Sequence, residues 1–364
     1  MFPVKQILKA VVRKQEQWRG VAIPSLHFGD TAGNRQLVAQ LPQLTQKFQP
    51  TPWLYNTHLQ LVFLGVRKKA SRPLNYDHTD TLTMADGGRT ALTWLGYDLP
   101  ATTPTIVLLH TITGSPHSMQ ELVQDLHQLT GWRVVLCVRR GHADLGLQTP
   151  QLNILGSTTD LREQLQLIQQ RFPNSPLYGV GSSAGSGLLV RYLGEEGEAA
   201  VFNATFAYCP GYNTDEAFGK AHPVYSRLMA KKLVHQFITP NLAQIGHLAS
   251  VARLSVASSL ADFHDHIYEL AGYDDLAAYS QASNPMHVFE GISKPLMILN
   301  SEDDPVCKIE NAYPHLELIK RKTNMVLVTT ARGSHCAHYE GWTAKSWAAR
   351  LMANYFLTIA RQPV

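Results

Sequence analysis

A serine between two glycines constrains this chain more than any other feature. Residues 181–185 read Gly-Ser-Ser-Ala-Gly; they follow an apolar run of strand length and precede a helix-like segment. A serine on a sharp turn from strand to helix has strained φ and ψ angles, and the residues two before and two after it nearly collide, so both are best glycine. Gly181 and Gly185 fill these positions. The pattern predicts a nucleophile, Ser183, at the top of a sheet, although such a motif arises by chance in roughly one in ten chains of this length.

Short apolar runs recur along the chain and are separated by helix-like segments. The helix-like segments are 118–130, 157–171 and 186–193, and the apolar runs are 105–110, 133–138, 177–181, 203–209, 295–300 and 325–329. Continuous apolar runs indicate strands that are covered on both faces. Their alternation with helices predicts an α/β fold with a mostly parallel, doubly wound sheet. Upstream, residues 80–85 and 90–96 flank a turn-forming Asp-Gly-Gly, which predicts an antiparallel hairpin at the sheet edge.

The alternation predicts how the chain is divided. Residues 211–286 interrupt it with a largely helical pattern between two core strands, and we interpret them as a cap or lid. Such an insertion lies where α/β folds bind ligands, at the carboxyl ends of the strands. We therefore expect residues 76–210 and 287–364 to form the core. Residues 1–75 are expected to form an N-terminal extension that packs on this core.

Composition excludes several classes of protein. The 364 residues are 45% hydrophobic and 16% charged, which fits a large globular domain and not a disordered or fibrous chain. The formal net charge is only +4, and the longest basic runs are 67–69 and 320–322, so no nucleic-acid partner is expected. The four cysteines have no Cys-x-x-Cys spacing. We therefore expect reduced thiols rather than a zinc or redox site.

The N-terminal segment is the one strongly biased region. No apolar run approaches the ~18 residues that span a bilayer, and the N-terminus lacks the apolar stretch of a signal peptide, so a cytoplasmic location is expected. The first twenty residues nevertheless combine apolar side chains with five basic ones, Lys5, Lys9, Arg13, Lys14 and Arg19. This bias suggests peripheral membrane contact or organelle targeting, and a terminal helix packed on its own domain explains it equally well.

Partners for Ser183 follow at the ends of later strands. Serine is a poor nucleophile unless a histidine accepts its proton, and that histidine needs a carboxylate to orient it. The run 295–300 is followed by Ser-Glu-Asp-Asp-Pro, and the run 325–329 is followed within a few residues by His335. The order serine, acid, histidine is typical of one fold with this strand and helix pattern. We predict Asp304 as the acid, with Asp303 as the alternative and Glu302 as a more distant one.

An acyl-transfer site also needs N–H donors for the oxyanion. One is expected from the residue after the nucleophile, Ala184, and the other from the loop 110–114, where Ile112 is the best candidate. An ordinary strand-to-helix turn is the other interpretation of this loop. Arg139 and Arg140 follow another predicted strand, and a structural role is expected for them rather than the binding of an anionic head group.

Cofactor and metal motifs do not match the glycines around Ser183 or the paired histidines. The glycines in 179–185 lack the Gly-x-Gly-x-x-Gly spacing of dinucleotide sites, and the chain has no Gly-Lys-Ser/Thr phosphate loop. His335 and His338 are three residues apart, and His264 and His266 are two apart, but no His-Glu-x-x-His motif accompanies either pair. We therefore expect no cofactor and no metal, and we interpret His264 and His266 as solvated cap residues.

Several short motifs occur in one order from about residue 33 to the C-terminus. They are the segments 50–54, 57–60, 114–118, 140–141, 177–185, 192–195, 303–305, 333–335 and 339–341. In these motifs the chain resembles the α/β-hydrolase group of bacterial YheT-like proteins, plant embryogenesis-associated proteins and animal abhydrolase-domain proteins. The resemblance implies an α/β-hydrolase fold, a helical cap and chemistry on acyl or lipid esters. It also implies a nucleophile, acid and base at Ser183, Asp304 and His335, the residues that the pattern predicts independently.

The chain departs from this group at three places. Thr111 stands where the group usually has glycine, Ser186 where it often has a second glycine, and Ala337 with His338 where it has glycine and an aromatic residue. The Cβ of Thr111 is expected to alter or narrow the loop. These departures bear on efficiency and substrate range, because they remove none of the three predicted catalytic residues.

The sequence thus predicts a serine hydrolase that cleaves carboxylic esters through an acyl-enzyme. Two alternatives share the same residues. One is an alcohol O-acyltransferase, which passes the acyl group to an alcohol in place of water. The other is a binding protein of weak catalytic power on the same scaffold.

Overall fold

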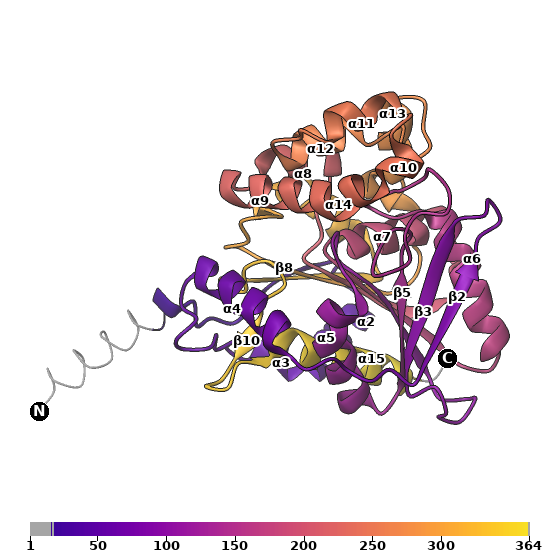
Figure 1. Ribbon diagram of the computed structural model, residues 1–364. Coiled ribbons are helices and arrows are strands. Elements are labelled where there is room, and N and C mark those ends of the chain that lie inside the picture. Colours follow the sequence, from indigo (N-terminus) through magenta and orange to yellow (C-terminus); the bar gives the residue numbers. More distant parts are fainter. Residues whose placement is uncertain (1–15, 17, 363–364) are drawn as a thin grey trace, which may run out of the picture.

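One large sheet organises the molecule. The computed structural model describes residues 16 and 18–362, and its main sheet has nine strands in the order β2-β3-β5-β4-β6-β7-β8-β9-β1 (Figure 1). The strands are β1 (Ser25–Phe28), β2 (His78–Thr83), β3 (Arg89–Leu95), β4 (Thr105–Leu109), β5 (Arg133–Val138), β6 (Leu177–Ser182), β7 (Phe202–Tyr208), β8 (Leu296–Ser301) and β9 (Met325–Thr330). Strands β4 to β9 are mutually parallel. The predicted mostly parallel sheet is confirmed.

The strand order reverses between β4 and β6. From β4 the chain passes to β5 on one side and then returns to place β6 on the other. The loops that follow β4 and β6 therefore leave in opposite directions and open a crevice at the carboxyl ends of the strands, where α/β sheets bind ligands. Ser183 follows β6 directly. The topology thus positions the predicted nucleophile at this crevice.

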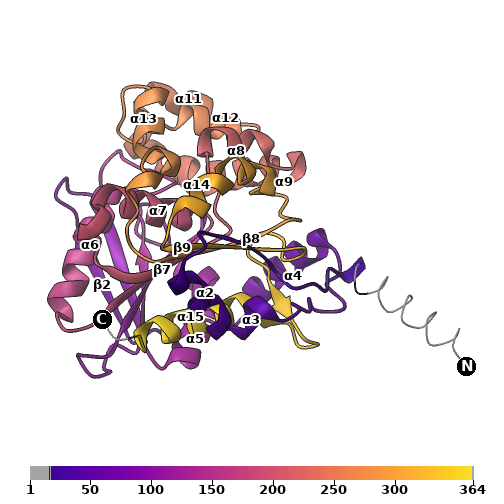
Figure 2. The same ribbon diagram turned by 180° about the vertical axis from the view of Figure 1, so that it is seen from behind.

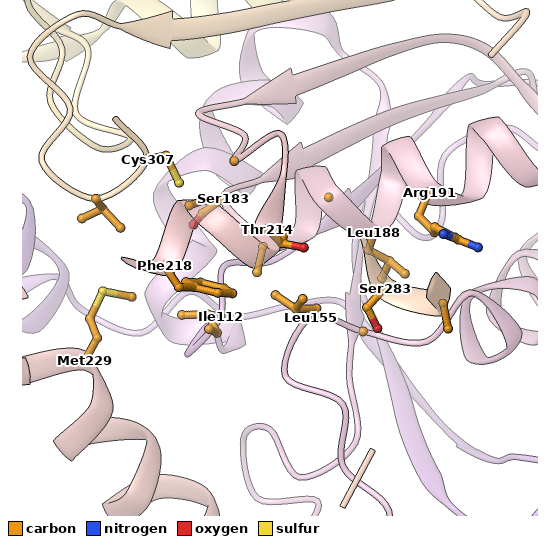
Figure 3. A pocket seen from close by; sticks show the side chains of 17 residues that line it. Ile112, Leu155, Ser183, Leu188, Arg191, Thr214, Phe218, Met229, Ser283 and Cys307 are labelled. Carbon is orange, nitrogen blue, oxygen red and sulfur yellow. The ribbon is translucent and has the colours of Figure 1, made fainter. Parts of the chain in front are cut away.

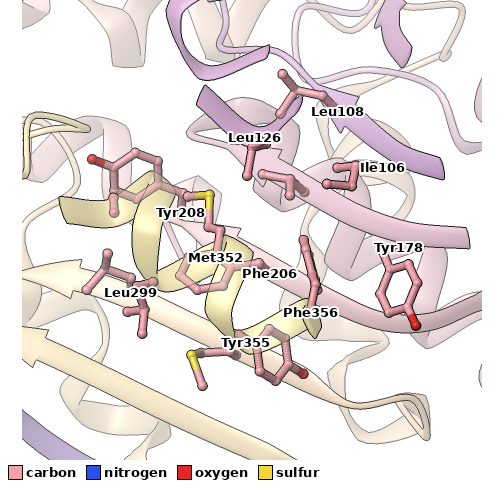
Figure 4. Packing of buried hydrophobic residues seen from close by; sticks show 14 of the residues in the cluster. Ile106, Leu108, Leu126, Tyr178, Phe206, Tyr208, Leu299, Met352, Tyr355 and Phe356 are labelled. Carbon is pink, nitrogen blue, oxygen red and sulfur yellow. The ribbon is translucent and has the colours of Figure 1, made fainter. Parts of the chain in front are cut away.

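Helices cover both faces of the sheet. One face carries α5 (Pro116–Thr130) and α15 (Trp347–Ala360), and the other carries α6 (Thr158–Arg171), α7 (Ala184–Glu196) and α14 (Leu316–Arg321) (Figures 1 and 2). Side chains of α15 such as Met352 and Phe356 pack against Phe206 of the sheet (Figure 4). Since both faces are covered, β4, β5 and β6 are buried along their whole lengths, which explains their continuous apolar runs.

The antiparallel strands lie at the two edges of the sheet. The hairpin of β2 and β3 lies at one edge, as predicted, and β3 joins it to β5. At the other edge, β1 pairs with β9, which the sequence analysis did not predict. The four residues of β1 are exposed or half-buried, so this edge strand has no apolar run that marks it. The N-terminal segment is therefore partly built into the sheet and does more than pack on it.

The helices between β7 and β8 lie over the carboxyl ends of the strands (Figure 1). They are α8 (Thr214–Lys220), α9 (Pro223–Leu233), a π-helical turn (Val234–Ile238), α10 (Leu242–Ile245), α11 (Ala249–Leu254), α12 (Leu260–His266) and α13 (Leu276–Ser283). Their own apolar cluster includes Phe237, Phe263 and Tyr279, and it extends to Ile112 and Leu155 of the core loops.

The N-terminal segment contributes to the main core. It contains α2 (Ala32–Gln40), α3 (Pro42–Thr45) and α4 (Thr57–Ala70). Near the C-terminus, β10 (Tyr339–Glu340) pairs with β11 (Lys345–Ser346), and Glu340 also bridges to Pro50 of the N-terminal segment. Leu41 and Leu44 are buried in the same cluster as the side chains of α5 and α15.

We expect Leu41→Ala to lower the free energy of unfolding by about 2–5 kcal/mol, because it removes buried methyl groups and leaves a cavity. Leu59→Ala is the matched control, since Leu59 on α4 is 40% exposed, and its cost should stay near 0.5 kcal/mol. Urea unfolding of both variants measures the difference. Equal, small losses would show that the N-terminal segment is dispensable for the core.

Candidate active site

Ser183 occupies a strained turn between β6 and α7. Its backbone has φ 52° and ψ −118°, which lies outside the regions that L-residues prefer. A Cβ on Gly181 would lie 2.4 Å from the carbonyl oxygen of Gly185, and one on Gly185 would lie 2.2 Å from that of Leu109. Both glycines are therefore required by close backbone approach, as the sequence pattern predicts.

The structure brings Ser183, His335 and Asp304 into one hydrogen-bonded chain. His335 Nδ1 lies 2.7 Å from Asp304 Oδ2, and His335 Nε2 lies 2.8 Å from Ser183 Oγ. Because an ionised carboxylate only accepts, Nδ1 carries the proton of neutral His335, and in that form Nε2 is left to accept from the serine hydroxyl. This arrangement allows His335 to remove the proton of Ser183 as its oxygen attacks an electrophile.

Asp304 is fully buried yet has its lone pairs satisfied. Its Oδ1 accepts hydrogen bonds from the amides of Val306 at 2.7 Å and Cys307 at 2.9 Å, while Oδ2 faces His335. Burial is the largest single effect and lowers the pKa of His335, but the negative charges of Asp304 and Cys336 together with the hydrogen bond to Asp304 outweigh it and raise that pKa to about 9. The carboxylate thus stabilises the imidazolium that proton transfer creates.

The structure assigns different positions to the two neighbouring aspartates. Asp303 has other partners than the His335 ring: its Oδ1 accepts from the amide of Ser334 at 2.8 Å and from Ser301 Oγ at 2.5 Å. It therefore fixes the backbone just before His335. Glu302 is exposed and contacts none of these groups. The geometry favours Asp304 over both alternatives.

The two residues predicted to donate to the oxyanion lie at the same cavity as Ser183. Ile112 and Ala184 both line it, and in the described part of the chain neither amide nitrogen has a hydrogen-bond acceptor. Free N–H groups at a helix start and in the β4 loop are suited to bind a developing negative charge. Their position fits the predicted role as oxyanion donors, which stays a prediction.

A buried arginine braces this loop, which sequence analysis missed. Arg139 donates to the carbonyl oxygens of His110 at 2.9 Å and Thr111 at 2.8 Å, and its amide donates to His110 Nε2 at 3.1 Å. The next residue, Arg140, instead forms ion pairs with Asp86 and Asp160. Both arginines thus have structural roles, as predicted. The specific role of Arg139, which is to hold the loop that contains Ile112, depends on contacts between distant segments and could not be predicted.

The N-terminal segment also supports the site. Thr57, at the start of α4, donates from Oγ1 to the carbonyl of Asp303 at 2.8 Å, and its own carbonyl accepts from Ser334 Oγ at 3.1 Å. It ties the loop after β8 to the loop after β9, and so holds the residues next to Asp304 and His335. No sequence motif indicated this role.

An apolar pocket opens beside Ser183 (Figure 3). It has a volume of about 680 Å³, part of it open to solvent, and its walls come from α7, the loops after β4, β5 and β8, and the segment between β7 and β8. The labelled apolar side chains are Ile112, Leu155, Leu188, Phe218 and Met229, and the polar ones include Thr214, Ser283 and Arg191. Such a lining suits an acyl chain.

The positions where the chain departs from the related group are accommodated without loss of the site. Thr111 is not among the described residues with positive φ, so its Cβ costs no backbone strain. Ser186 Oγ donates to the carbonyl of Ser183, Ala337 is buried, and His338 fills the space above Gly333, where a Cβ would lie 2.3 Å from its Nε2.

The histidines considered as metal ligands have other hydrogen-bond partners in the structure. His338 lies between Tyr208 Oη at 3.1 Å and Thr330 Oγ1 at 2.9 Å, whereas His335 faces Ser183 and Asp304. The interpretation of His264 as solvated is wrong: it is buried and pairs with Asp215 at 3.3 Å. Its burial follows from the apolar cluster of the cap helices, into which α12 packs.

One other group of potential ligand atoms is present. The sulfur atoms of Cys209 and Cys336 and one ring nitrogen of His335 lie within 4.8 Å of one another. Both nitrogens of His335 already have partners, so a metal ion would have to displace Asp304 or Ser183.

Comparison with known proteins places the chain in a family. Residues 100–341, two thirds of its length, match the Hydrolase_4 family, described as serine aminopeptidase, S33. The chain belongs to this family. It is 26% identical to phospholipase ABHD3 of Bos taurus, with 89% of this chain and 81% of that protein covered. It is 27% identical to embryogenesis-associated protein EMB8 of Picea glauca (85% and 70% covered) and 24% identical to monoacylglycerol lipase ABHD2 of Mus musculus (97% and 89% covered).

Solved structures agree on the fold. An esterase of Pyrobaculum calidifontis matches with a TM-score of 0.52 at 14% identity, covering 83% of this chain and 91% of that one. The carboxylesterase EstE1 from a metagenomic library also matches with a TM-score of 0.52, at 15% identity, covering 84% and 97%. The predicted α/β-hydrolase fold, the resemblance to abhydrolase-domain and embryogenesis-associated proteins, and the enzyme class of carboxylic ester hydrolase are confirmed. The acyltransferase alternative finds no support here.

The predicted membrane contact lies outside the described residues, apart from the last of its basic side chains, Arg19. Within residues 16 and 18–362, no helix combines the length and apolar character needed to cross a bilayer.

The acid limb of the pH profile of kcat/KM should lie above pH 6.5, because His335 acts as a base only when neutral and its pKa is raised. Asp304→Asn should move this limb to lower pH by about one to three units and lower kcat by about 10⁴-fold. Asp303→Asn is the control and should leave the limb near its wild-type position. A larger shift with Asp303→Asn than with Asp304→Asn would contradict the assignment.

Proposed function

We propose that the protein hydrolyses lipid or other acyl esters with Ser183 as nucleophile, His335 as general base and acid, and Asp304 as the group that orients His335. The observation that carries this proposal is the hydrogen-bonded chain from Asp304 through His335 to Ser183, which ends in an apolar pocket. A serine, its base and the orienting acid at these distances form the arrangement that acyl transfer requires.

The reaction proceeds in two halves. Ser183 Oγ attacks the ester carbonyl while His335 Nε2 takes its proton, and the amides of Ile112 and Ala184 bind the oxyanion. His335 then returns the proton to the leaving alcohol, and an acyl-enzyme remains. A water molecule, activated by the same nitrogen, attacks the acyl group and releases the acid. Arg139 supports both halves because it holds the Ile112 loop in place.

The substrate class follows from the pocket and from the relatives. Its walls are mostly aliphatic or aromatic, which favours an acyl chain over a charged or highly polar group. Two of the relatives are named phospholipase and monoacylglycerol lipase, and both names denote enzymes that act on lipid esters. We infer a lipid ester as substrate, with residues 211–286 acting as a cap, since Phe218, Met229 and Ala282 of this segment line the pocket.

Ser183→Ala should abolish fluorophosphonate labelling and lower turnover of p-nitrophenyl esters, from acetate to decanoate, by at least about 10⁴-fold, because no other group supplies the nucleophile. Labelling is followed on gels and turnover by absorbance, with circular dichroism as the control for folding. Equal labelling of both proteins would exclude Ser183 as the nucleophile. Assays with added glycerol detect acyl transfer as a second product, which would favour the acyltransferase alternative.

Gly187 offers a test of the pocket itself. It lies on α7 among the lining residues, and an added Cβ would meet nothing within 4 Å. We expect Gly187→Leu to lower kcat/KM for decanoate by about tenfold or more while acetate hydrolysis changes little, since the new side chain occupies space that a long acyl chain needs.

The matched control is Gly65→Leu on α4, where an added Cβ also meets nothing within 4 Å but lies outside the pocket. This variant should leave the chain-length profile unchanged. An unchanged profile in Gly187→Leu would show that acyl chains bind elsewhere.

A further inference from the structure

Cys336 follows His335 directly and has contacts unlike those of a packed core thiol. Its backbone lies in the left-handed region, with φ 60°, and its amide donates to Cys209 Sγ at 3.3 Å. Its own sulfur lies 3.5 Å from Ser182 Oγ and within 4.8 Å of Cys209 Sγ. Two thiols therefore adjoin each other beside the predicted base.

A second cavity gives Cys336 access from the side away from the acyl pocket. This cavity has about 480 Å³, part of it open to solvent, and it is lined by Cys336 together with Lys68, Ser182, Tyr208 and His338. It shares no lining residue with the pocket at Ser183. A small molecule can therefore approach Cys336 without entering the space where the ester binds.

The surroundings of Cys336 favour its thiolate. Burial opposes ionisation, but the hydrogen bond with Cys209, the charge of His335 and the hydrogen bond with Ser182 lower the pKa of Cys336 below the usual value of a thiol. Lys68 lines the same cavity. By contrast, burial raises the pKa of Cys137, and likewise those of Cys209 and Cys307. Cys336 is thus the one described cysteine that combines access with thiolate character.

We propose that Cys336 is a site of oxidation by peroxides, and that Cys209 resolves the oxidised product as a disulfide that switches the enzyme off. The loss of activity rests on the proposed function, whereas the chemistry at the two sulfurs does not. In the first step the Cys336 thiolate attacks one oxygen of hydrogen peroxide, the O–O bond breaks, and sulfenic acid and hydroxide form. In the second step Cys209 Sγ attacks the sulfenic sulfur, and the new S–S bond forms as water leaves. Overall, two thiols and one peroxide give one disulfide and two waters.

The disulfide should displace His335. Its two sulfurs must approach to about 2.05 Å, whereas they now lie within 4.8 Å, and Cys336 is covalently joined to His335. The amide of Cys336 also loses its present partner when Cys209 Sγ moves. A shift of about 1 Å at a catalytic group costs on the order of 10²-fold in rate, so the oxidised enzyme should be nearly inactive.

The first test measures the bond directly. The wild-type protein is treated with hydrogen peroxide, blocked with N-ethylmaleimide and digested with trypsin without reduction, and mass spectrometry then searches for the linked peptides 192–220 and 333–345. We expect this link in the wild type and also in Ser183→Ala, where catalysis plays no part. In Cys209→Ala we expect sulfenic acid at Cys336, trapped by dimedone. Absence of both products would overturn the proposal.

The second test measures the consequence. Peroxide should lower wild-type ester turnover at least about 10²-fold, and dithiothreitol should restore it. Cys336→Ala, compared with its own untreated sample, should resist peroxide, whereas Cys137→Ala should remain as sensitive as the wild type. Inactivation of Cys336→Ala at the wild-type rate, or full activity of protein that carries the 209–336 link, would refute the switch. If the proposed ester hydrolysis itself fails, the linked peptides still report on the two sulfurs.

Discussion

The close approach of Gly185 to the end of β4 is the contact on which the site depends. It places the first turn of α7 within van der Waals distance of the carbonyl oxygens of Leu109 and His110, so no Cβ fits between them. The same contact therefore sets two things at once: the strained turn that presents Ser183, and the distance from that turn to the Ile112 loop. The proposed nucleophile and the proposed oxyanion donors are held together by one glycine because β4 and β6 are neighbours at the point where the strand order reverses.

Different contacts hold Asp304 and His335, the proposed acid and base. Asp304 and His335 follow β8 and β9, which are adjacent and parallel, so their loops leave the sheet side by side. Loops alone would leave two side chains mobile, but the amide of Ser334 binds Asp303, and Thr57 of the N-terminal segment binds both loops. The carboxylate of Asp303 thus fixes the backbone just before His335. This explains why two acids in sequence have two separate tasks.

Local pattern was sufficient for most of the strands and for the strained turn at Ser183, because each depends on residues close in sequence. The choice between Asp303 and Asp304 depended on which oxygen faces a loop 31 residues away, and no local pattern carries that information. The support from Arg139 and Thr57 was missed for the same reason, since both bind backbone carbonyls that any residue supplies. The strand β1 has no apolar run because its side chains are exposed or half-buried at an edge.

Charge links His335, the proposed base, to the neighbouring thiol of Cys336. Asp304 and the thiolate of Cys336 both stabilise a protonated His335, and protonated His335 in turn stabilises the thiolate. His335 must lose its proton before it can act as a base, so the pair of opposite charges opposes the formation of the neutral His335 that the reaction needs. Raising the pH removes the proton from His335 and frees the base, but it leaves the thiolate charged and open to oxidants. Conditions that favour catalysis therefore also leave Cys336 in its reactive form, which joins the two chemistries in one small volume behind Ser183.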